Sequence, residues 1–235
     1  MEHFSKWIAG VRNAGTWLLV PFLAVAVLML TFGVIAREVA NGGASELDRY
    51  VMFAFRSSTD NFSTPVGPAW VQEAVRDVTS LGSFTVLGLL LMVVAGYLIV
   101  AGKRDSALLA VLAVFGGVAL GNLLKFEFAR PRPDMFAPAT KVFTASFPSD
   151  HATLSAITYL TLATVLAKTI GTRAIRNFLM AVAMTLTVLV GVSRVYLGVH
   201  YPTDVLAGWC IGFAWAICCC TLMKRFQLKG SRGTF

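Results

Sequence analysis

The sequence predicts an all-α, polytopic membrane protein with six transmembrane helices and short interfacial helices on the outer face, in a single domain over residues 1–235. Of the 235 residues, 57% are hydrophobic and only 14% are charged, whereas soluble domains carry about 25% charged residues. The mean hydropathy is +0.72. The net charge of +8 comes from basic residues in short gaps between apolar runs, so we expect no nucleic-acid partner.

Six apolar runs have the length of membrane spans, since about 20 residues at about 1.5 Å each cross a hydrocarbon core of about 30 Å. No small-residue cleavage pattern follows the first run, which is therefore interpreted as a retained span and not as a signal peptide. The predicted spans cover residues 17–36, 81–102, 107–124, 152–170, 177–193 and 203–223.

The gaps between the spans differ in charge on the two sides of the membrane. One side, which includes both termini, has 11 basic and 2 acidic residues, and the other has 9 basic and 10 acidic residues. Loops rich in Lys and Arg stay in the cytoplasm. We therefore expect a multi-pass protein of the cell (inner) membrane whose second side faces the periplasm or the extracellular space.

Two amphipathic segments stand in the long outward gap of residues 37–80. Ser45 with Asp48 three residues later is a capping signal, and the apolar residues between Leu47 and Phe55 then share one helical face. A second segment with an apolar face follows Pro68. Each is interpreted either as an interfacial helix on the outer leaflet or as a helix packed on top of the bundle.

Three groups of polar residues stand at the outward ends of the later spans. Each group alone has an ordinary explanation: Lys125 could extend to lipid headgroups, Ser149 could cap a helix, and His200 could form a local pair with Asp204. Their convergence on one membrane face needs another explanation, because charged groups there are costly and usually functional. The groups are Lys125, Arg130, Arg132 and Pro133; Pro148, Ser149, Asp150 and His151; and Ser193, Arg194, His200 and Asp204.

The residue types in these groups suit a phosphate. Lys125, Arg132 and Arg194 supply fixed positive charge for a tetrahedral oxyanion, and arginine can donate two hydrogen bonds at once. Ser149 adds a hydroxyl, and the backbone N–H groups of the helix that follows it can add further donors.

Two histidines complete the chemistry. A neutral imidazole held in one tautomer by a carboxylate suits a nucleophile, and His200 with Asp204 forms such a pair if the chain turns between them. Pro202 at the first helical position favours that turn. His151 is then available to protonate the leaving oxygen.

The order and spacing of these residues resemble the three-part signature of the type-2 phosphatidic-acid phosphatase superfamily. The resemblance extends over residues 125–212, whereas the N-terminal third is similar only in its span pattern. The three parts are Lys125-x6-Arg132-Pro133, Pro148-Ser149-Asp150-His151 and Ser193-Arg194-x5-His200-x3-Asp204.

The resemblance implies a phosphatase of membrane lipids that uses no cofactor and no metal, and no ligand spacing in the chain indicates a metal site. His200 would attack phosphorus and form a phosphohistidine, Asp204 would orient it, and His151 would protonate the leaving group and later activate water. The residues implied to bind the phosphoryl oxygens are Lys125, Ser149, Arg132 and Arg194.

Position 150 departs from the commonest signature, which has glycine there. Asp150 resembles the bacitracin-resistance type of undecaprenyl pyrophosphate phosphatase, so we predict undecaprenyl pyrophosphate as the substrate. Phosphatidylglycerophosphate, phosphatidic acid, the phosphates of lipid A and a lipid phosphotransferase reaction are the alternatives. The carboxylate of Asp150 could keep His151 protonated or could point to solvent, and the role of Arg130 is open.

An anion transporter that uses the same cations is the rival from another class. It predicts binding at the membrane midplane and two related halves, whereas the polar groups stand at one face and no repeat is visible.

Cys210 and the run Cys218 to Cys220 are interpreted as packing residues, with a lipidated cluster as the alternative for the run. Gly208 and Gly212 indicate close helix packing.

Overall fold

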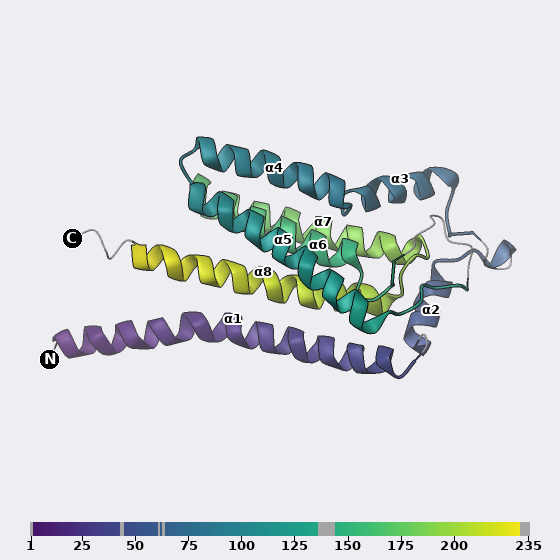
Figure 1. The fold of residues 1–235 in the computed structure, drawn as a ribbon, viewed down its shortest axis with the longest axis horizontal. Coiled ribbons are helices and arrows are strands. Elements are labelled where there is room, and N and C mark those ends of the chain that lie inside the picture. Colours follow the sequence, from purple (N-terminus) through teal and green to yellow (C-terminus); the bar gives the residue numbers. More distant parts are fainter. Residues whose placement is uncertain (1, 43–44, 61, 63, 136–143, 231–235) are drawn as a thin grey trace.

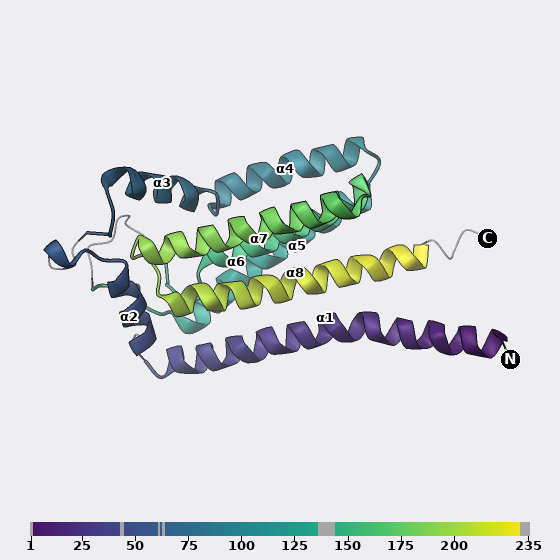
Figure 2. The same ribbon diagram turned by 180° about the vertical axis from the view of Figure 1, so that it is seen from behind.

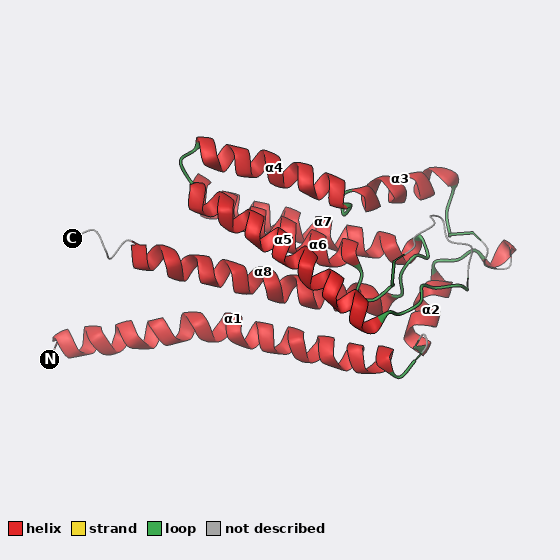
Figure 3. Cartoon of the chain, in the orientation of Figure 1, coloured by secondary structure: helices red, strands yellow, loops and turns green. Residues whose placement is uncertain are grey.

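The named secondary-structure elements are all helices in the residues that the computed structural model describes, which are 2–42, 45–60, 62, 64–135 and 144–230. Figure 3 shows helices joined by loops over these ranges, as the all-α prediction requires. The helices are α1 (Glu2–Ala40), α2 (Glu46–Ala54), the 3-10 helix η1 (Ser58–Asp60), α3 (Ala69–Ser80), α4 (Phe84–Val100), α5 (Arg104–Phe128), α6 (Asp150–Ile170), α7 (Arg173–Tyr196) and α8 (Pro202–Gly230).

The long helices run side by side along the long axis of the molecule (Figure 1). The start of α1 and the end of α8 lie at one end of this bundle. The other end, which we call the loop end, carries α2 and the α5–α6 and α7–α8 connections, as the reverse view also shows (Figure 2). α1 packs along α8 at one edge, and α4 packs on α5 at the other.

Five helical segments in the described ranges are each long and apolar enough to cross a membrane, and α3 with α4 makes a sixth if the two are counted as one span bent by 50°. The prediction of six spans is confirmed in this sense. The predicted second span began at residue 81, but α4 begins at Phe84, where the hydroxyl of Ser83 caps the helix by accepting a hydrogen bond from Val86 N at 3.3 Å. The five single segments are Leu18–Ala40, Arg104–Phe128, Asp150–Thr169, Arg173–Tyr196 and Pro202–Met223.

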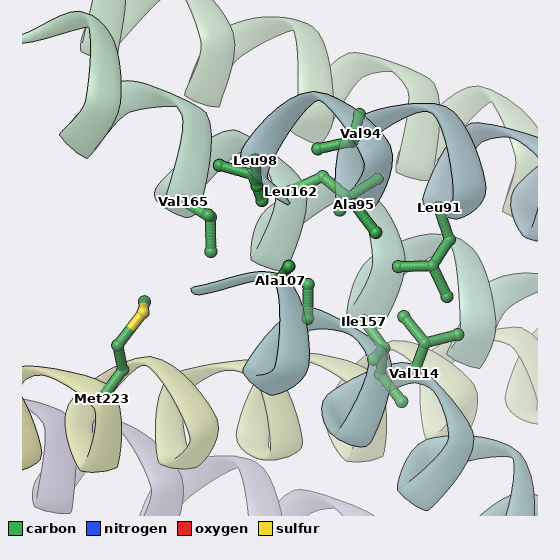
Figure 4. Close-up of a cluster of buried hydrophobic side chains, with 11 residues drawn as sticks. Leu91, Val94, Ala95, Leu98, Ala107, Val114, Ile157, Leu162, Val165 and Met223 are labelled. Atoms are coloured by element: carbon green, nitrogen blue, oxygen red, sulfur yellow. The ribbon is translucent and has the colours of Figure 1, made fainter. Parts of the chain in front are cut away.

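α6 is the central helix of the bundle, in contact with α4, α5, α7 and α8. Within its most apolar window, 72% of the residues are buried inside the protein. Figure 4 shows part of the core that surrounds it, in which Ile157, Leu162 and Val165 of α6 pack with side chains from α4, α5 and α8. α6 therefore fixes the positions of its neighbours, including the helix ends that carry the polar groups.

Two glycines let α8 approach α6 closely, as the sequence predicts. A Cβ atom on Gly208 would lie 2.8 Å from the carbonyl oxygen of Ser149, and one on Gly212 would lie 2.7 Å from Cβ of Ala156. Any larger residue at these positions would push the helices apart. The contact brings the start of α8 beside the start of α6.

The two short helices at the loop end pack on the bundle. α2 has the predicted capping box of Ser45 and Asp48, but it buries Asp48 and Met52, while Leu47 of the predicted apolar face is 57% exposed. The face that α2 turns to the protein thus combines Asp48 and Met52 with Val51 and Phe55 of the predicted apolar face. α3 instead follows its pattern, because Val71 and Val75 pack against the end of α7.

Candidate active site

The seven residues predicted to form the site gather at the loop end. They come from six segments that the chain separates by up to 79 positions, and the helix ends around α6 bring them together. Lys125 lies in the last turn of α5, Arg132 in the connection after it, Ser149 and His151 at the start of α6, Arg194 in the last turn of α7, His200 in the α7–α8 connection and Asp204 in the first turn of α8.

His200 and Asp204 form the predicted pair. Nδ1 of His200 lies 3.4 Å from Oδ2 of Asp204, and the same oxygen accepts a hydrogen bond from the backbone N–H of Tyr201 at 2.9 Å. α8 begins at Pro202, so the proline occupies the first helical position that favours the turn. The hydroxyl of Ser146 donates to the same carboxylate oxygen and lies 3.3 Å from Nδ1.

The tautomer of His200 follows from its second ring nitrogen. Nη1 of Arg132 lies 3.1 Å from Nε2 of His200, and because a guanidinium can only donate, Nε2 must be the acceptor. The proton is therefore on Nδ1, facing Asp204, and the lone pair of Nε2 faces the cations. Burial lowers the pKa of His200 to about 4, although the hydrogen bond and charge of Asp204 act to raise it, so the ring is neutral at physiological pH.

Arg132 is held by main-chain oxygens on both sides of the site. Its Nε donates to the carbonyl of Thr144 at 2.9 Å, and Nη1 donates to the carbonyl of Val199 at 2.8 Å. Burial is the largest influence on its pKa and lowers it, but an arginine remains charged at neutral pH. The guanidinium is thus a fixed positive charge beside Nε2 of His200.

Lys125 is buried and paired with Asp150. Its Nζ lies 3.1 Å from Oδ2 of Asp150 and donates to the carbonyl of Ala145 at 2.6 Å. The Asp150 side chain is 38% exposed. The carboxylate therefore pairs with a cation of the site while it remains partly exposed to solvent.

Two buried polar atoms at the site have no hydrogen-bond partner among the described residues. They are Oγ of Ser149 and Nε of Arg194. Ser149 precedes α6 but does not cap it with its side chain, while its backbone N–H donates to the carbonyl of Asp204 at 3.1 Å. Arg194 is anchored from Nη1 to Oγ1 of Thr79 at 3.1 Å. Buried donors are normally paired, so both atoms are suited to a bound anion.

His151 lines a cavity of about 340 Å³ between the start of α4, α5 and α6. Asp150, Asn122 and the glycines at positions 82, 117 and 121 also line this cavity. The cations that act on the imidazole of His151 include Arg194, Arg132 and Lys125. His151 therefore lies within electrostatic reach of His200.

The sequence did not assign four residues that hold this geometry. Arg130 was noted without a role, and Asp48 was predicted only as a cap, but Arg130 bridges Asp48 and Asp204. Ser146 and Thr79 carried no recognisable signal, because a lone hydroxyl residue is common in any sequence.

Among the described residues, no group of three or more His, Cys, Asp or Glu side chains is arranged to hold a metal ion.

Comparisons with known proteins show which family the chain resembles. A family model described as the PAP2 superfamily matches residues 106–228, more than half of the chain. Phosphatidylglycerophosphatase B of Bacillus subtilis is 35% identical over 144 residues, which are 61% of this chain and 70% of the relative. Undecaprenyl-diphosphatase of Sulfolobus acidocaldarius is 32% identical over 125 residues, and this chain covers only 56% of its length.

A solved structure is also similar. The crystal structure of a transmembrane PAP2-type phosphatidylglycerolphosphate phosphatase from Bacillus subtilis superimposes with a TM-score of 0.74 at 28% identity, covering 86% of this chain and 96% of that one.

Proposed function

This chain belongs to the PAP2 superfamily and is a membrane lipid phosphatase, and from that premise we propose which residues and which lipid its reaction uses. The family predicted from the three-part signature is confirmed, and so is the enzyme class, a hydrolase of lipid phosphate esters. The anion transporter, which predicts a binding site at the membrane midplane, is not favoured. The polar groups of this chain lie at one end of the bundle.

His200 is the proposed nucleophile. The observation that carries this proposal is the unprotonated Nε2, which faces Arg132 at 3.1 Å while Nδ1 is directed at Asp204. An imidazole in this tautomer presents a lone pair to phosphorus and needs no general base. The negative charge of Asp204 stabilises the positive ring that forms during attack.

The unpaired Oγ of Ser149 and Nε of Arg194 support a phosphoryl group as the ligand. With Lys125 and Arg132 they supply a hydroxyl and three cations for its oxygens, which carry the charge that develops during transfer. Preorganised donors of this kind provide most of the rate in phosphoryl transfer, because there is little covalent chemistry for the protein to perform.

The reaction would have two steps. In the first, a bond forms between Nε2 of His200 and phosphorus, the bond from phosphorus to the lipid oxygen breaks, and protonated His151 gives its proton to that oxygen. In the second, water attacks the phosphohistidine, His151 takes a proton from the water, and the bond between phosphorus and nitrogen breaks to release phosphate. An acceptor lipid in place of water would make the enzyme a phosphotransferase.

A small apolar pocket of about 30 Å³ between α4, α5 and α6 lies beside the cavity at His151. Phe84, Val118 and Leu154 line both spaces, and Leu87, Leu91 and other apolar side chains line the small pocket. A lipid could keep its tail in the bilayer while its phosphate enters the polar end. This arrangement supports a lipid whose leaving oxygen lies beside His151.

Undecaprenyl pyrophosphate is the proposed substrate, on the basis of Asp150 in the signature. Phosphatidylglycerophosphate is the second candidate, because the Bacillus subtilis phosphatidylglycerophosphatase B is 35% identical to this chain. Phosphatidic acid and lipid A phosphates are further alternatives. A panel of these lipids, assayed for released phosphate with the purified protein, separates the candidates by kcat/KM.

The same assay tests the nucleophile. His200→Gln is expected to abolish phosphate release from every lipid, whereas His3→Gln, a change at a histidine outside the three polar groups, leaves it unchanged. With lipid carrying labelled phosphorus, the wild-type protein should retain label that survives alkali and is lost in acid, as a phosphohistidine does. Full activity of His200→Gln would contradict the mechanism.

The active site is proposed to face the periplasm or the extracellular space in the cell (inner) membrane, because the opposite side has the +9 charge balance (11 basic and 2 acidic residues). Reporter fusions should place residue 104 in the cytoplasm and residue 134 outside. The reverse pattern would move the reaction to the cytoplasmic leaflet.

A further inference from the structure

The carboxylate of Asp48 is fully buried, although it belongs to a short helix whose neighbouring side chains are largely exposed. It accepts more hydrogen bonds than a capping box needs. Oδ1 accepts from the backbone N–H of Thr203 at 2.9 Å, and Oδ2 accepts from the hydroxyl of Thr203 at 2.8 Å and from Nη2 of Arg130 at 3.1 Å. The capping bond from the N–H of Ser45 is the longest of the four, at 3.3 Å.

Arg130 lies between two buried carboxylates. Nη2 contacts Asp48, while Nη1 donates to Oδ1 of Asp204 at 2.6 Å and to the hydroxyl of Thr203 at 2.9 Å. The guanidinium also lies over the ring of Tyr201, with its carbon 4.1 Å from the ring centroid. A buried cation is stabilised when such partners surround it, and here they connect α2 with the start of α8.

The arrangement divides the oxygens of Asp204 between two tasks. Oδ1 accepts from Arg130, and Oδ2 accepts from Ser146 and the N–H of Tyr201 and faces Nδ1 of His200. A guanidinium readily binds both oxygens of one carboxylate. Because Asp48 holds the second nitrogen of Arg130, the guanidinium contacts only one oxygen of Asp204.

We propose that Asp48 is a positioning residue for the nucleophile, which acts through Arg130 to keep Oδ2 of Asp204 available to His200. The proposal rests on the proposed role of His200. Asp48 belongs to the N-terminal third of the chain, which lies outside the signature, so this part of the chain would help to position the nucleophile. Without Asp48, the fork of Arg130 would turn to both oxygens of Asp204, and the imidazole would lose its orientation.

The test compares Asp48→Asn with Glu46→Gln. Both variants remove one negative charge from α2, but Glu46 is exposed. Asp48→Asn is expected to lower kcat/KM about tenfold, the rate equivalent of one hydrogen bond to a charged group, and Glu46→Gln is expected to leave it unchanged. Folding is checked by size-exclusion chromatography in detergent, and rates are corrected for the active fraction measured by phosphoenzyme labelling.

Two inhibitors separate a positioning role from a purely structural one. Orthovanadate binds like the transition state, in line with the nucleophile, whereas inorganic phosphate needs only the cations. Asp48→Asn should raise the Ki of vanadate about tenfold, in step with its loss of rate, and leave the Ki of phosphate within about twofold. Equal weakening of both inhibitors, or of neither, would overturn the proposal.

A second variant covers the case in which Asp48→Asn does not fold. Thr203→Val keeps the shape of the residue and the N–H that Asp48 accepts, but removes the hydroxyl that contacts both Asp48 and Arg130. Thr203→Val should also raise the Ki of vanadate relative to the Ki of phosphate, but by less than Asp48→Asn does. An unchanged ratio of the two Ki values would overturn the proposal. Failure of the proposed function is recognised separately, as activity that survives in His200→Gln.

Discussion

Nη1 of Arg132 lies 3.1 Å from Nε2 of His200, so the atom proposed to attack phosphorus is in contact with a cation proposed to bind phosphoryl oxygen. The contact has two consequences. It assigns the ring proton to Nδ1, and it places the charge that stabilises the phosphoryl group beside the reacting lone pair. A phosphate that binds beside the positive charge of Arg132 therefore arrives next to the nucleophile, and such proximity accelerates transfer.

His200 is expected to remain neutral over the physiological pH range. Its pKa is lowered to about 4, chiefly by burial, so protonation and loss of the lone pair occur only as the pH falls toward 4. Histidine-selective NMR in detergent checks this, because the chain has only 3 histidines and His200→Gln identifies the signal. A resonance that titrates near 6.5, the ordinary value for histidine, would contradict the prediction.

His151→Gln is expected to lose more activity on a lipid with an alcohol leaving group than on a pyrophosphate. An alkoxide needs a proton as the bond breaks, so the loss on phosphatidic acid should reach about 10²- to 10⁴-fold, whereas a phosphate leaving group departs more easily without one. The measurement is kcat/KM on both lipids with one protein preparation. Equal losses would argue against a proton-donor role.

Asp150→Asn is expected to strengthen the binding of inorganic phosphate. The carboxylate neutralises Lys125 at 3.1 Å, and its removal frees that cation and removes a repulsive charge. Because Asp150 is partly exposed, the Ki of phosphate should fall only about two- to fivefold, or about 0.5–1 kcal/mol.

The control for this prediction is Asp134→Asn, which removes an exposed carboxylate from the α5–α6 connection. It is expected to leave the Ki unchanged. Weaker phosphate binding in Asp150→Asn would mean that the carboxylate supports Lys125 and does not compete for it.

Gly82 lies in the break between α3 and α4, and Gly82→Ala is expected to lower activity by displacing His151. A Cβ at this position would clash with Cγ1 of Val190 and would lie 3.2 Å from Cδ2 of His151. Overpacking of this kind costs about 1–3 kcal/mol and should displace the imidazole, so both Tm and kcat/KM should fall.

Gly96→Ala is the matched change within α4, since a Cβ there would meet no atom within 4 Å. Its activity should equal that of the wild type. If Gly82→Ala were as active as Gly96→Ala, the break beside Gly82 would have no part in holding His151.

The sequence could predict features that depend on local pattern. Hydropathy located the spans because a bilayer of fixed thickness requires long apolar runs, and it brought the polar groups to one side because the spans alternate in direction. The capping box at Ser45, the turn at Pro202 and the close approach at Gly208 were predictable for the same reason, since each depends on residues a few positions apart.

Only the tertiary structure decided which polar partners meet. Arg130 contacts Asp48 82 positions away and Asp204 74 positions away, and Arg194 contacts Thr79 across 115 positions. The burial of Asp48, the turn of Asp150 toward Lys125 and the bend between α3 and α4 likewise depend on how the helices pack around α6. A hydrogen bond between distant segments leaves no periodic trace in either segment, so its partners become visible only when the fold brings them within a few ångströms.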